Sequence, residues 1–166
     1  MFAFAGFFFV LFLIGLAVVV FSPPSSQRAE VKQYRVEDNV YLEGMRWKVI
    51  TAHDLGSTIT FPGPIAAIEQ ASGRFVRVHF EVENQSPVRK VVGYVGLIDS
   101  QGNEYSPRLW ADSWVPLGDR LLPGTSIGQE RHTYTVIFDI PRDASGLQFY
   151  PAGITPYKDV RINLGF

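Results

Sequence analysis

The sequence contains no cysteine. A chain without cysteine forms no disulfide, no thiolate metal site and no redox pair, and it carries no lipid attached through an N-terminal lipoprotein cysteine. It also lacks an excess of either charge, because 15 basic residues stand against 16 acidic residues. A nearly neutral chain creates no field that gathers a polyanion, so we expect no nucleic acid among its partners.

Charged side chains are missing from the first 27 residues. Residues 2–21 read FAFAGFFFVLFLIGLAVVVF, which also lacks strong hydrogen-bonding side chains. A helix of this length spans about 30 Å, the thickness of the hydrocarbon layer of a bilayer. The sequence therefore predicts a single transmembrane anchor over residues 1–22, with the lipid bilayer as its first partner. The side chains expected to hold the anchor in the membrane include Phe7, Phe8, Phe9, Phe12, Leu13 and Leu16.

A cleaved signal peptide and a buried helix of a globular protein are the alternatives to this anchor. A signal peptide has basic residues at its start, an apolar core of about 7 to 15 residues and small residues before the cleavage site. This chain has no basic start, its apolar run is longer, and two prolines follow Ser22. A buried helix would need a surrounding layer of protein that a chain of 166 residues does not supply. We therefore expect the anchor to stay uncleaved.

The hydrophobic pattern changes after a short linker at residues 23–30, and we expect one domain over residues 31–166. Residues 75–83 alternate between apolar and polar side chains, which is typical of a strand with one buried face. The expected inward set is Val76, Val78, Phe80 and Val82, and the outward set is Arg77, His79, Glu81 and Glu83. Similar patterns predict strands within residues 45–52, 88–98, 133–140, 146–150 and 160–164.

About seven short strands separated by turn residues indicate an all-β, two-layer antiparallel sandwich. Two segments fit this pattern poorly. Residues 56–73 are long for a connection between strands, and they have room for a short helix at residues 65–70. Residues 107–120 form the second long segment and contain Trp110 and Trp114.

Four stretches of the chain together resemble a bacterial family of extracytoplasmic immunoglobulin-like domains of unknown function. They are residues 73–84 (GRFVRVHFEVEN), 97–105 (LIDSQGNEY), 122–124 (LPG) and 136–141 (VIFDIP). The resemblance covers about residues 40–164 and implies an immunoglobulin-like sandwich in the periplasm. Members of the family are lipoproteins, secreted proteins or anchored proteins, and the resemblance brings no catalytic residues. This chain departs from the pattern by lacking the lipoprotein cysteine and by its two long segments.

The orientation of the anchor has two conflicting indications. Arg28, Lys32 and Arg35 follow the anchor closely, and the positive-inside rule therefore favours a cytoplasmic domain. The family resemblance favours a domain outside the cytoplasmic membrane. We expect a single-pass membrane protein with a periplasmic domain, and the conflict stays open at this point.

No catalytic constellation is evident in the sequence. His53, His79 and His132 are the natural bases near neutral pH, but they are scattered and no G-x-S-x-G motif accompanies them. Residues 99–104 have some oxygen donors of a calcium loop but lack its acidic ladder, so a hairpin turn is the favoured interpretation. We expect no enzyme activity, no cofactor and no bound metal.

The paired tryptophans suggest a partner contact instead. Trp110 and Trp114 lie four residues apart and would face one way on a helical turn, although they could equally cap the open end of the sandwich. Our hypothesis from sequence is a non-enzymatic, membrane-anchored protein-interaction module, an accessory or scaffolding subunit that binds other integral membrane proteins. The alternative is a periplasmic sensor of a small molecule or of envelope stress, with its ligand between the two long segments.

Overall fold

The computed structural model describes residues 30–60, 68–108, 117–122 and 124–166. Within these residues, no helix is long and apolar enough to cross a membrane. The predicted anchor at residues 1–22 lies outside the described residues, as do Trp110 and Trp114. The predictions that concern them therefore stay predictions.

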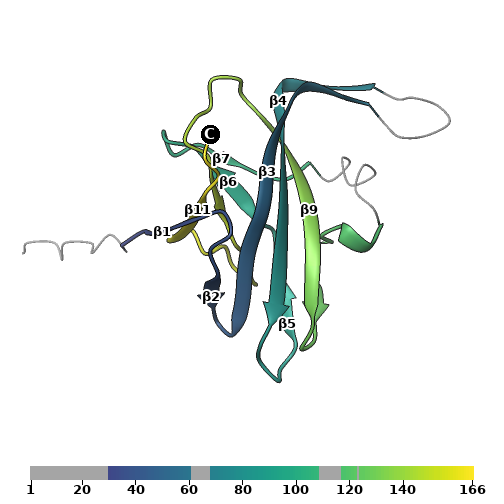
Figure 1. Ribbon diagram of the computed structural model, residues 1–166, viewed down its shortest axis with the longest axis vertical. Coiled ribbons are helices and arrows are strands. Elements are labelled where there is room, and N and C mark those ends of the chain that lie inside the picture. Colours follow the sequence, from purple (N-terminus) through teal and green to yellow (C-terminus); the bar gives the residue numbers. More distant parts are fainter. Residues whose placement is uncertain (1–29, 61–67, 109–116, 123) are drawn as a thin grey trace, which may run out of the picture.

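The described chain is all-β, as the alternation predicted (Figure 1). The strands are β1 (Lys32–Arg35), β2 (Val40–Leu42), β3 (Met45–Thr60), β4 (Ile68–Asn84), β5 (Lys90–Val92), β6 (Gly96–Ile98), β7 (Glu104–Tyr105), β8 (Thr125–Ile127), β9 (Arg131–Ile140), β10 (Gln148–Tyr150) and β11 (Val160–Asn163). One 3₁₀ turn, η2 (Leu117–Asp119), precedes β8.

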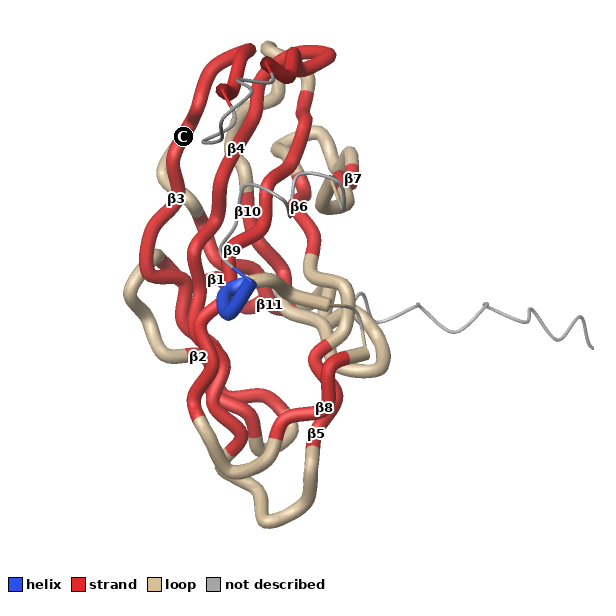
Figure 2. The backbone as a smooth tube through the Cα atoms, turned by 90° about the vertical axis from the view of Figure 1, so that its right-hand side faces the viewer, coloured by secondary structure: helices blue, strands red, loops and turns tan. Residues whose placement is uncertain are grey.

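The strands form a sandwich of two main sheets (Figure 2). The four-stranded sheet has the order β2-β3-β4-β9, and the five-stranded sheet has the order β1-β11-β10-β6-β7. β5 and β8 make a separate two-stranded sheet. The pairing is antiparallel except that β1 runs parallel to β11, a departure from the purely antiparallel prediction.

The hydrophobic core lies between the two main sheets. The predicted inward set of β4 is confirmed, because Val76, Val78, Phe80 and Val82 are fully buried. The Phe80 ring lies 6.0 Å from the Trp47 ring on β3 and 5.1 Å from the Phe149 ring on β10. Phe80 thus joins one sheet to the other at the centre of the core.

The predicted strand at residues 88–98 is wrong as a single strand, because the chain leaves one sheet and enters another between β5 and β6. Two glycines permit this crossing. A Cβ added to Gly93 would lie 1.9 Å from the carbonyl oxygen of Gly153, and one added to Gly96 would lie 2.2 Å from the Tyr150 ring. Such close approaches leave room for no other residue.

The short helix for which residues 65–70 have room does not form in the part that the structure describes. Residues 68–70 belong to β4, where Ile68 pairs with Thr60 and Gln70 pairs with Thr58. Residues 56–60 and 68–73 therefore continue the strands β3 and β4. The β-branched residues of this stretch favour the extended backbone, and the ladder of the hairpin fixes it.

The described ends of the second long segment contact β9, the edge strand of the four-stranded sheet. On one side of residues 109–116, the Arg108 backbone N–H donates to the Ile137 carbonyl at 2.8 Å. On the other side, Arg120 forms a parallel bridge with Thr135. These contacts cover part of an edge that would otherwise be open to pairing with another chain.

Candidate functional site

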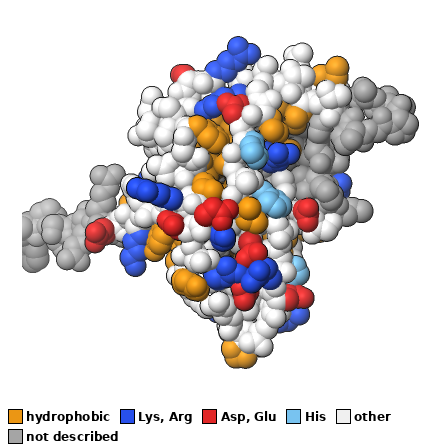
Figure 3. Space-filling model, in the orientation of Figure 1, with side chains coloured by type: hydrophobic (Ala, Val, Ile, Leu, Met, Phe, Trp, Pro, Cys, Tyr) orange, Lys and Arg blue, Asp and Glu red, His pale blue; other side chains and the backbone are white. Residues whose placement is uncertain are grey.

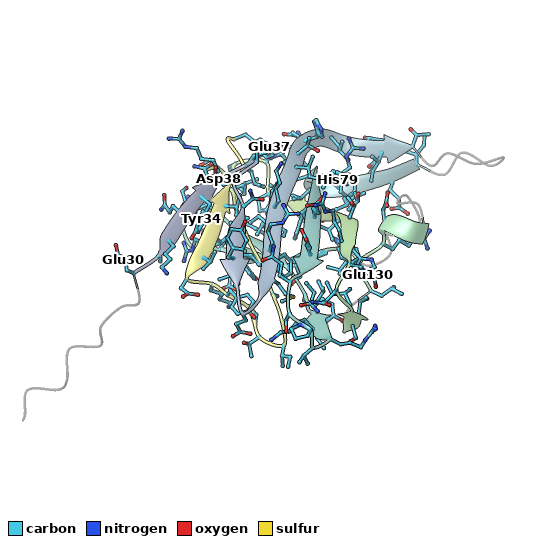
Figure 4. The ribbon with its side chains drawn as sticks, turned by 60° about the horizontal axis from the view of Figure 1, so that its bottom comes forward. Glu30, Tyr34, Glu37, Asp38, His79 and Glu130 are labelled. Atoms are coloured by element: carbon cyan, nitrogen blue, oxygen red, sulfur yellow. The ribbon has the colours of Figure 1, made fainter. Side chains whose placement is uncertain are left out.

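The three histidines lie on three different strands and do not form a catalytic group. His79 on β4, labelled in Figure 4, lies 2.8 Å from the Thr135 hydroxyl on the outer face of the four-stranded sheet. His53 is exposed and pairs with Arg77. His132 stacks on the Tyr134 ring and lies 3.0 Å from Glu130. Across the described parts of the chain, no cluster of three metal-ligating side chains occurs.

The predicted turn after β6 is confirmed. The carboxylate of its aspartate, Asp99, accepts hydrogen bonds from neighbouring groups of the protein. The buried Asp99 carboxylate accepts hydrogen bonds from the Asn103 side chain at 2.9 Å and the Tyr105 hydroxyl at 2.7 Å, and also from the backbone N–H groups of Gln101 and Asn103. Burial alone would raise its pKa, but these four hydrogen bonds outweigh burial and lower the pKa to about 2. Burial and the hydrogen bond to Asp99 raise the pKa of Tyr105 to about 12. This carboxylate stabilises a hairpin and offers no open position for calcium.

The lower half of the outer face of the four-stranded sheet carries a network of opposite charges (Figure 3). Arg46 bonds Glu83 at 2.6 Å and Glu81 at 2.5 Å, and Arg131 lies 3.5 Å from Glu81. Because each carboxylate faces an arginine, the face has little net field. These charges are paired with one another and are partly buried, so they are not offered to a charged ligand.

The β3–β4 hairpin extends beyond the sandwich as a two-stranded arm, which we define as residues 56–60 and 68–72. At its base the ladder has register shifts on both sides of Gly56, whose φ is +73°. The Asp54 carboxylate accepts the Gly56 N–H at 2.8 Å and pairs with Arg74. The Gly56 hydrogen bond and Arg74 lower the pKa of Asp54 against the effect of burial. These irregularities bend the ribbon away from the body of the sandwich.

The other strand of the arm is held equally firmly at its base. The Asp139 carboxylate on β9 accepts the backbone N–H groups of Ser72 at 3.0 Å and Gly73 at 3.3 Å, and it pairs with Arg108 at 2.7 Å. A Cβ on Gly73 would lie 2.3 Å from the Ile140 carbonyl oxygen. The arm therefore leaves the sandwich from a fixed junction.

One face of the arm is partly covered and the other is exposed. Leu55, Ile59 and Ala71 pack against a small second cluster made by Phe75 and Ile137. On the opposite face, Thr58, Thr60 and Gln70 are exposed, and Ile68 is 63% exposed. Ile68 is thus one of several exposed apolar side chains of the domain, and it lies at the end of the ribbon.

The arm also has free edges. β4 pairs with β9 only as far as Arg74, and β2 pairs with β3 only over Met45–Trp47. The Val49 carbonyl accepts one further bond, from the Glu37 backbone N–H at 2.9 Å. Past this point, no strand within the described ranges pairs with the outer edge of β3, so the edge runs open to the end of the arm at Thr60.

A second candidate surface, which we call the ledge, consists of Tyr94, Ile154 and Pro156. Tyr94 is 55% exposed and Ile154 is 89% exposed. Tyr94 and Pro156 separate two open hollows of about 310 Å³ and 440 Å³ and line both of them. The hollows are shallow and mainly apolar, which suits a flat contact better than an enclosed small molecule.

The two surfaces lie in different places relative to the start of the domain. The Lys32 backbone N–H donates to the Asp159 carbonyl at 2.8 Å, so the loop 151–159 that carries the ledge adjoins the first strand. Figures 1 and 4 show the arm pointing to the side opposite to Glu30. The ledge thus lies near the root of the domain, and the arm points away from it.

Neither surface was predicted as a contact in itself, although the arm lies within residues 56–73, one of the two segments between which the alternative hypothesis places a ligand. Its candidate contacts, Trp110 and Trp114, and its anchor residues lie outside the described residues. A signal for the arm was present in the uncharged alternation of residues 57–60 and in Ile68 and Ala71. No local pattern distinguishes Tyr94 or Ile154 from core residues, since their exposure depends on where distant segments meet.

Comparison with known proteins supports the fold and says little about the activity. No family model and no curated protein matches the chain. Among solved structures, the yjhA protein from Bacillus subtilis aligns with a TM-score of 0.55 at 10% identity, over 78% of this chain and 99% of that chain. An uncharacterized β-sandwich protein from Clostridium difficile aligns with a TM-score of 0.52 at 10% identity, over 85% and 99%. The secreted protein MPT63 from Mycobacterium tuberculosis aligns with a TM-score of 0.52 at 17% identity, over 81% and 98%.

These similarities confirm a β-sandwich. They are consistent with the immunoglobulin-like family of unknown function that the sequence motifs resemble. At such low identities they carry no residue roles to this chain.

Proposed function

We propose that this chain is a non-enzymatic, membrane-anchored protein-interaction module, an accessory or scaffolding subunit of a larger membrane protein complex. The arm is its proposed contact with the partner, which adds a strand along the open edge of β3. The observation that carries this proposal is that open edge, which continues into a ribbon projecting beyond the sandwich.

The chemistry of a strand edge favours a protein partner. Its exposed N–H and C=O groups form a ready template for another strand, whereas lipid offers them no partner. Proteins usually protect such edges with lysine, proline or a covering segment. The arm has a single charged residue, Glu69, and presents Ile68 beside its threonines. A partner strand would satisfy the backbone and cover Ile68.

The predicted anchor supports a position of the domain next to the membrane. The apolar run at residues 2–21 and the short linker after it support a domain held close to a bilayer. The family resemblance supports the periplasmic side. With the root at the membrane and the arm pointing away from the root, the partner strand would belong to a domain that stands clear of the bilayer.

The test is native sizing of the complete chain, extracted from its own membranes in mild detergent. We expect wild type to migrate in an assembly with other subunits. Thr58→Lys places a charge on the edge and should release the chain as a monomer, because lysine on an edge strand opposes strand addition. Gln101→Lys introduces the same charge at the exposed β6–β7 turn and should leave the assembly intact. A wild-type chain that migrates alone, or equal behaviour of the two variants, contradicts the proposal.

A further inference from the structure

We infer that the ledge rests on the phospholipid surface of the bilayer, with Ile154 and Tyr94 inserted at the level of the headgroups. This inference rests on the anchoring part of the proposed function. It is independent of the contact proposed for the arm.

The exposure and chemistry of the ledge fit a membrane interface. Ile154 is 89% exposed and Tyr94 is 55% exposed, and Pro156 lies between the two apolar hollows. Tyrosine prefers the interface, because its ring is apolar and its hydroxyl can stay hydrated. Burying an apolar face at this level attracts a protein to a bilayer without any charge.

The backbone holds Ile154 outward on a braced turn. Gly93 donates its N–H to the Ala152 carbonyl at 2.8 Å, and Ala152 forms a bridge with Pro156. Tyr157 donates its N–H to the Pro151 carbonyl at 3.0 Å, and its hydroxyl bonds Glu43 at 2.6 Å. The turn therefore keeps an isoleucine at its tip, where no other part of the described chain covers it.

The position of the ledge brings it to the membrane. The loop that carries Ile154 ends at Asp159, which accepts the hydrogen bond of Lys32. Only residues 22–31 separate Lys32 from the end of the apolar run at Phe21. Fully extended, these residues reach about 35 Å, and any bend shortens this reach. A tether of this length keeps the root side, where the loop of the ledge ends, within reach of the lipid.

Anionic lipid should not be required for this contact. Lys158 beside the second hollow is paired with Glu104 at 2.7 Å, so the two charges compensate each other. An apolar contact of this kind predicts insertion into neutral as well as anionic bilayers, and Lys32 and Arg35 on the adjoining β1 add attraction to anionic lipid. Insertion that occurs only with anionic lipid would contradict an apolar ledge.

The absence of cysteine from the chain allows a direct test. The complete chain carrying Ile154→Cys is labelled with an environment-sensitive fluorophore and reconstituted into phosphatidylcholine vesicles, with and without phosphatidylglycerol. Ile68→Cys on the arm is the matched control, because Ile68 is also an exposed isoleucine and lies at the start of β4. Quenching is measured with a lipid that carries a shallow nitroxide and with iodide in the buffer.

We expect the label at position 154 to be quenched several-fold more by the lipid nitroxide than the label at position 68, and to be protected several-fold from iodide. Equal iodide quenching at both positions, with no effect of the nitroxide, overturns the inference. Protection from iodide without nitroxide quenching also overturns it, since it would indicate a protein contact. Flotation of the same vesicles reports the anchor separately: a chain that floats but leaves position 154 in water disproves the ledge contact alone, and a chain that does not float disproves the anchoring as well.

Discussion

The two halves of the β3–β4 hairpin differ in what covers them. In the lower half, Val78, Phe80 and Val82 face the second sheet and are fully buried. In the arm, the same alternation continues, but no second sheet lies opposite to it among the described residues, and Ile68 is 63% exposed. One hairpin, whose ladder is interrupted by register shifts at Gly56, thus has a buried half and an exposed half.

The comparison shows that the alternation of apolar and polar residues determines where a strand forms. Whether a second sheet covers the strand determines whether its apolar side chains are buried. Burial of apolar area stabilises the lower half at roughly 25 cal/mol per Å² of surface removed from water. The arm gains its order from the ladder and from the junction at Gly56, Gly73 and Asp139. We therefore expect substitutions to have large effects on stability in the lower half and small effects in the arm.

The largest expected effect comes from Phe80→Ala. Phe80 contacts Trp47, Tyr134 and Phe149, so its removal leaves a cavity between the sheets. The free energy of unfolding should fall by about 3–5 kcal/mol, measured by urea titration of the complete chain in detergent. A loss comparable to that of an arm substitution would break the distinction between the two halves.

The junction should be nearly as sensitive. Gly73→Ala places a Cβ against the Ile140 carbonyl and should reduce the free energy of unfolding by about 1–3 kcal/mol. Gly118→Ala is the matched control, since a Cβ at that position meets no atom within 4 Å. If the two substitutions had equal effects on the same urea titration, the arm would not leave the sandwich from a fixed junction.

The turn after β6 gives the sandwich a dependence on pH in the acid range. The pKa of Asp99 is lowered from 3.8 to about 2, so its contribution to stability is present above pH 3.8 and is lost as the pH falls toward 2. Asp99→Asn should make the stability curve shallower in this range. Urea titrations at pH 4, 3 and 2 test this. If stability fell equally with pH in wild type and variant, the Asp99 carboxylate would not be the source of this pH dependence.

The smallest effect is expected for Ile68→Ser. Because Ile68 is largely exposed, we expect a change in the free energy of unfolding within about 0.5 kcal/mol. The same urea titration measures it, with Phe80→Ala as the reference. A loss above 1.4 kcal/mol would mean that Ile68 is covered within the chain and is unavailable to a partner.

Sequence alone predicted the features that depend on neighbouring residues. The alternation of residues 75–83 gave the strand, its buried face and the all-β class, and Asp99 to Gly102 gave a turn. It did not reveal that residues 56–60 and 68–73 extend β3 and β4, because the pairing of Thr58 with Gln70 joins residues that are distant in the sequence and local periodicity does not report such pairs. Nor did it reveal the break between β5 and β6, which depends on the distant Gly153 and Tyr150.

The candidate surfaces were less predictable than the fold. Whether Tyr94 or Ile154 is exposed depends on how the loop 151–159 meets β5 and β6, and sequence spacing carries no information on that. Trp110 and Trp114 remain predicted contacts outside the described residues. The open edge of β3 could be recognised only after the limits of β2 and β9 were known.

The central claim is that a partner strand adds to the arm, and position-specific photocrosslinking in native membranes tests it most directly. Thr58→Cys and Gln101→Cys each provide a single cysteine for a benzophenone label, since the chain has none of its own. We predict one adduct with a different protein from position 58 and no such adduct from position 101. Equal adducts from both positions, no adduct from position 58, or an adduct only with a second copy of this chain would contradict the account.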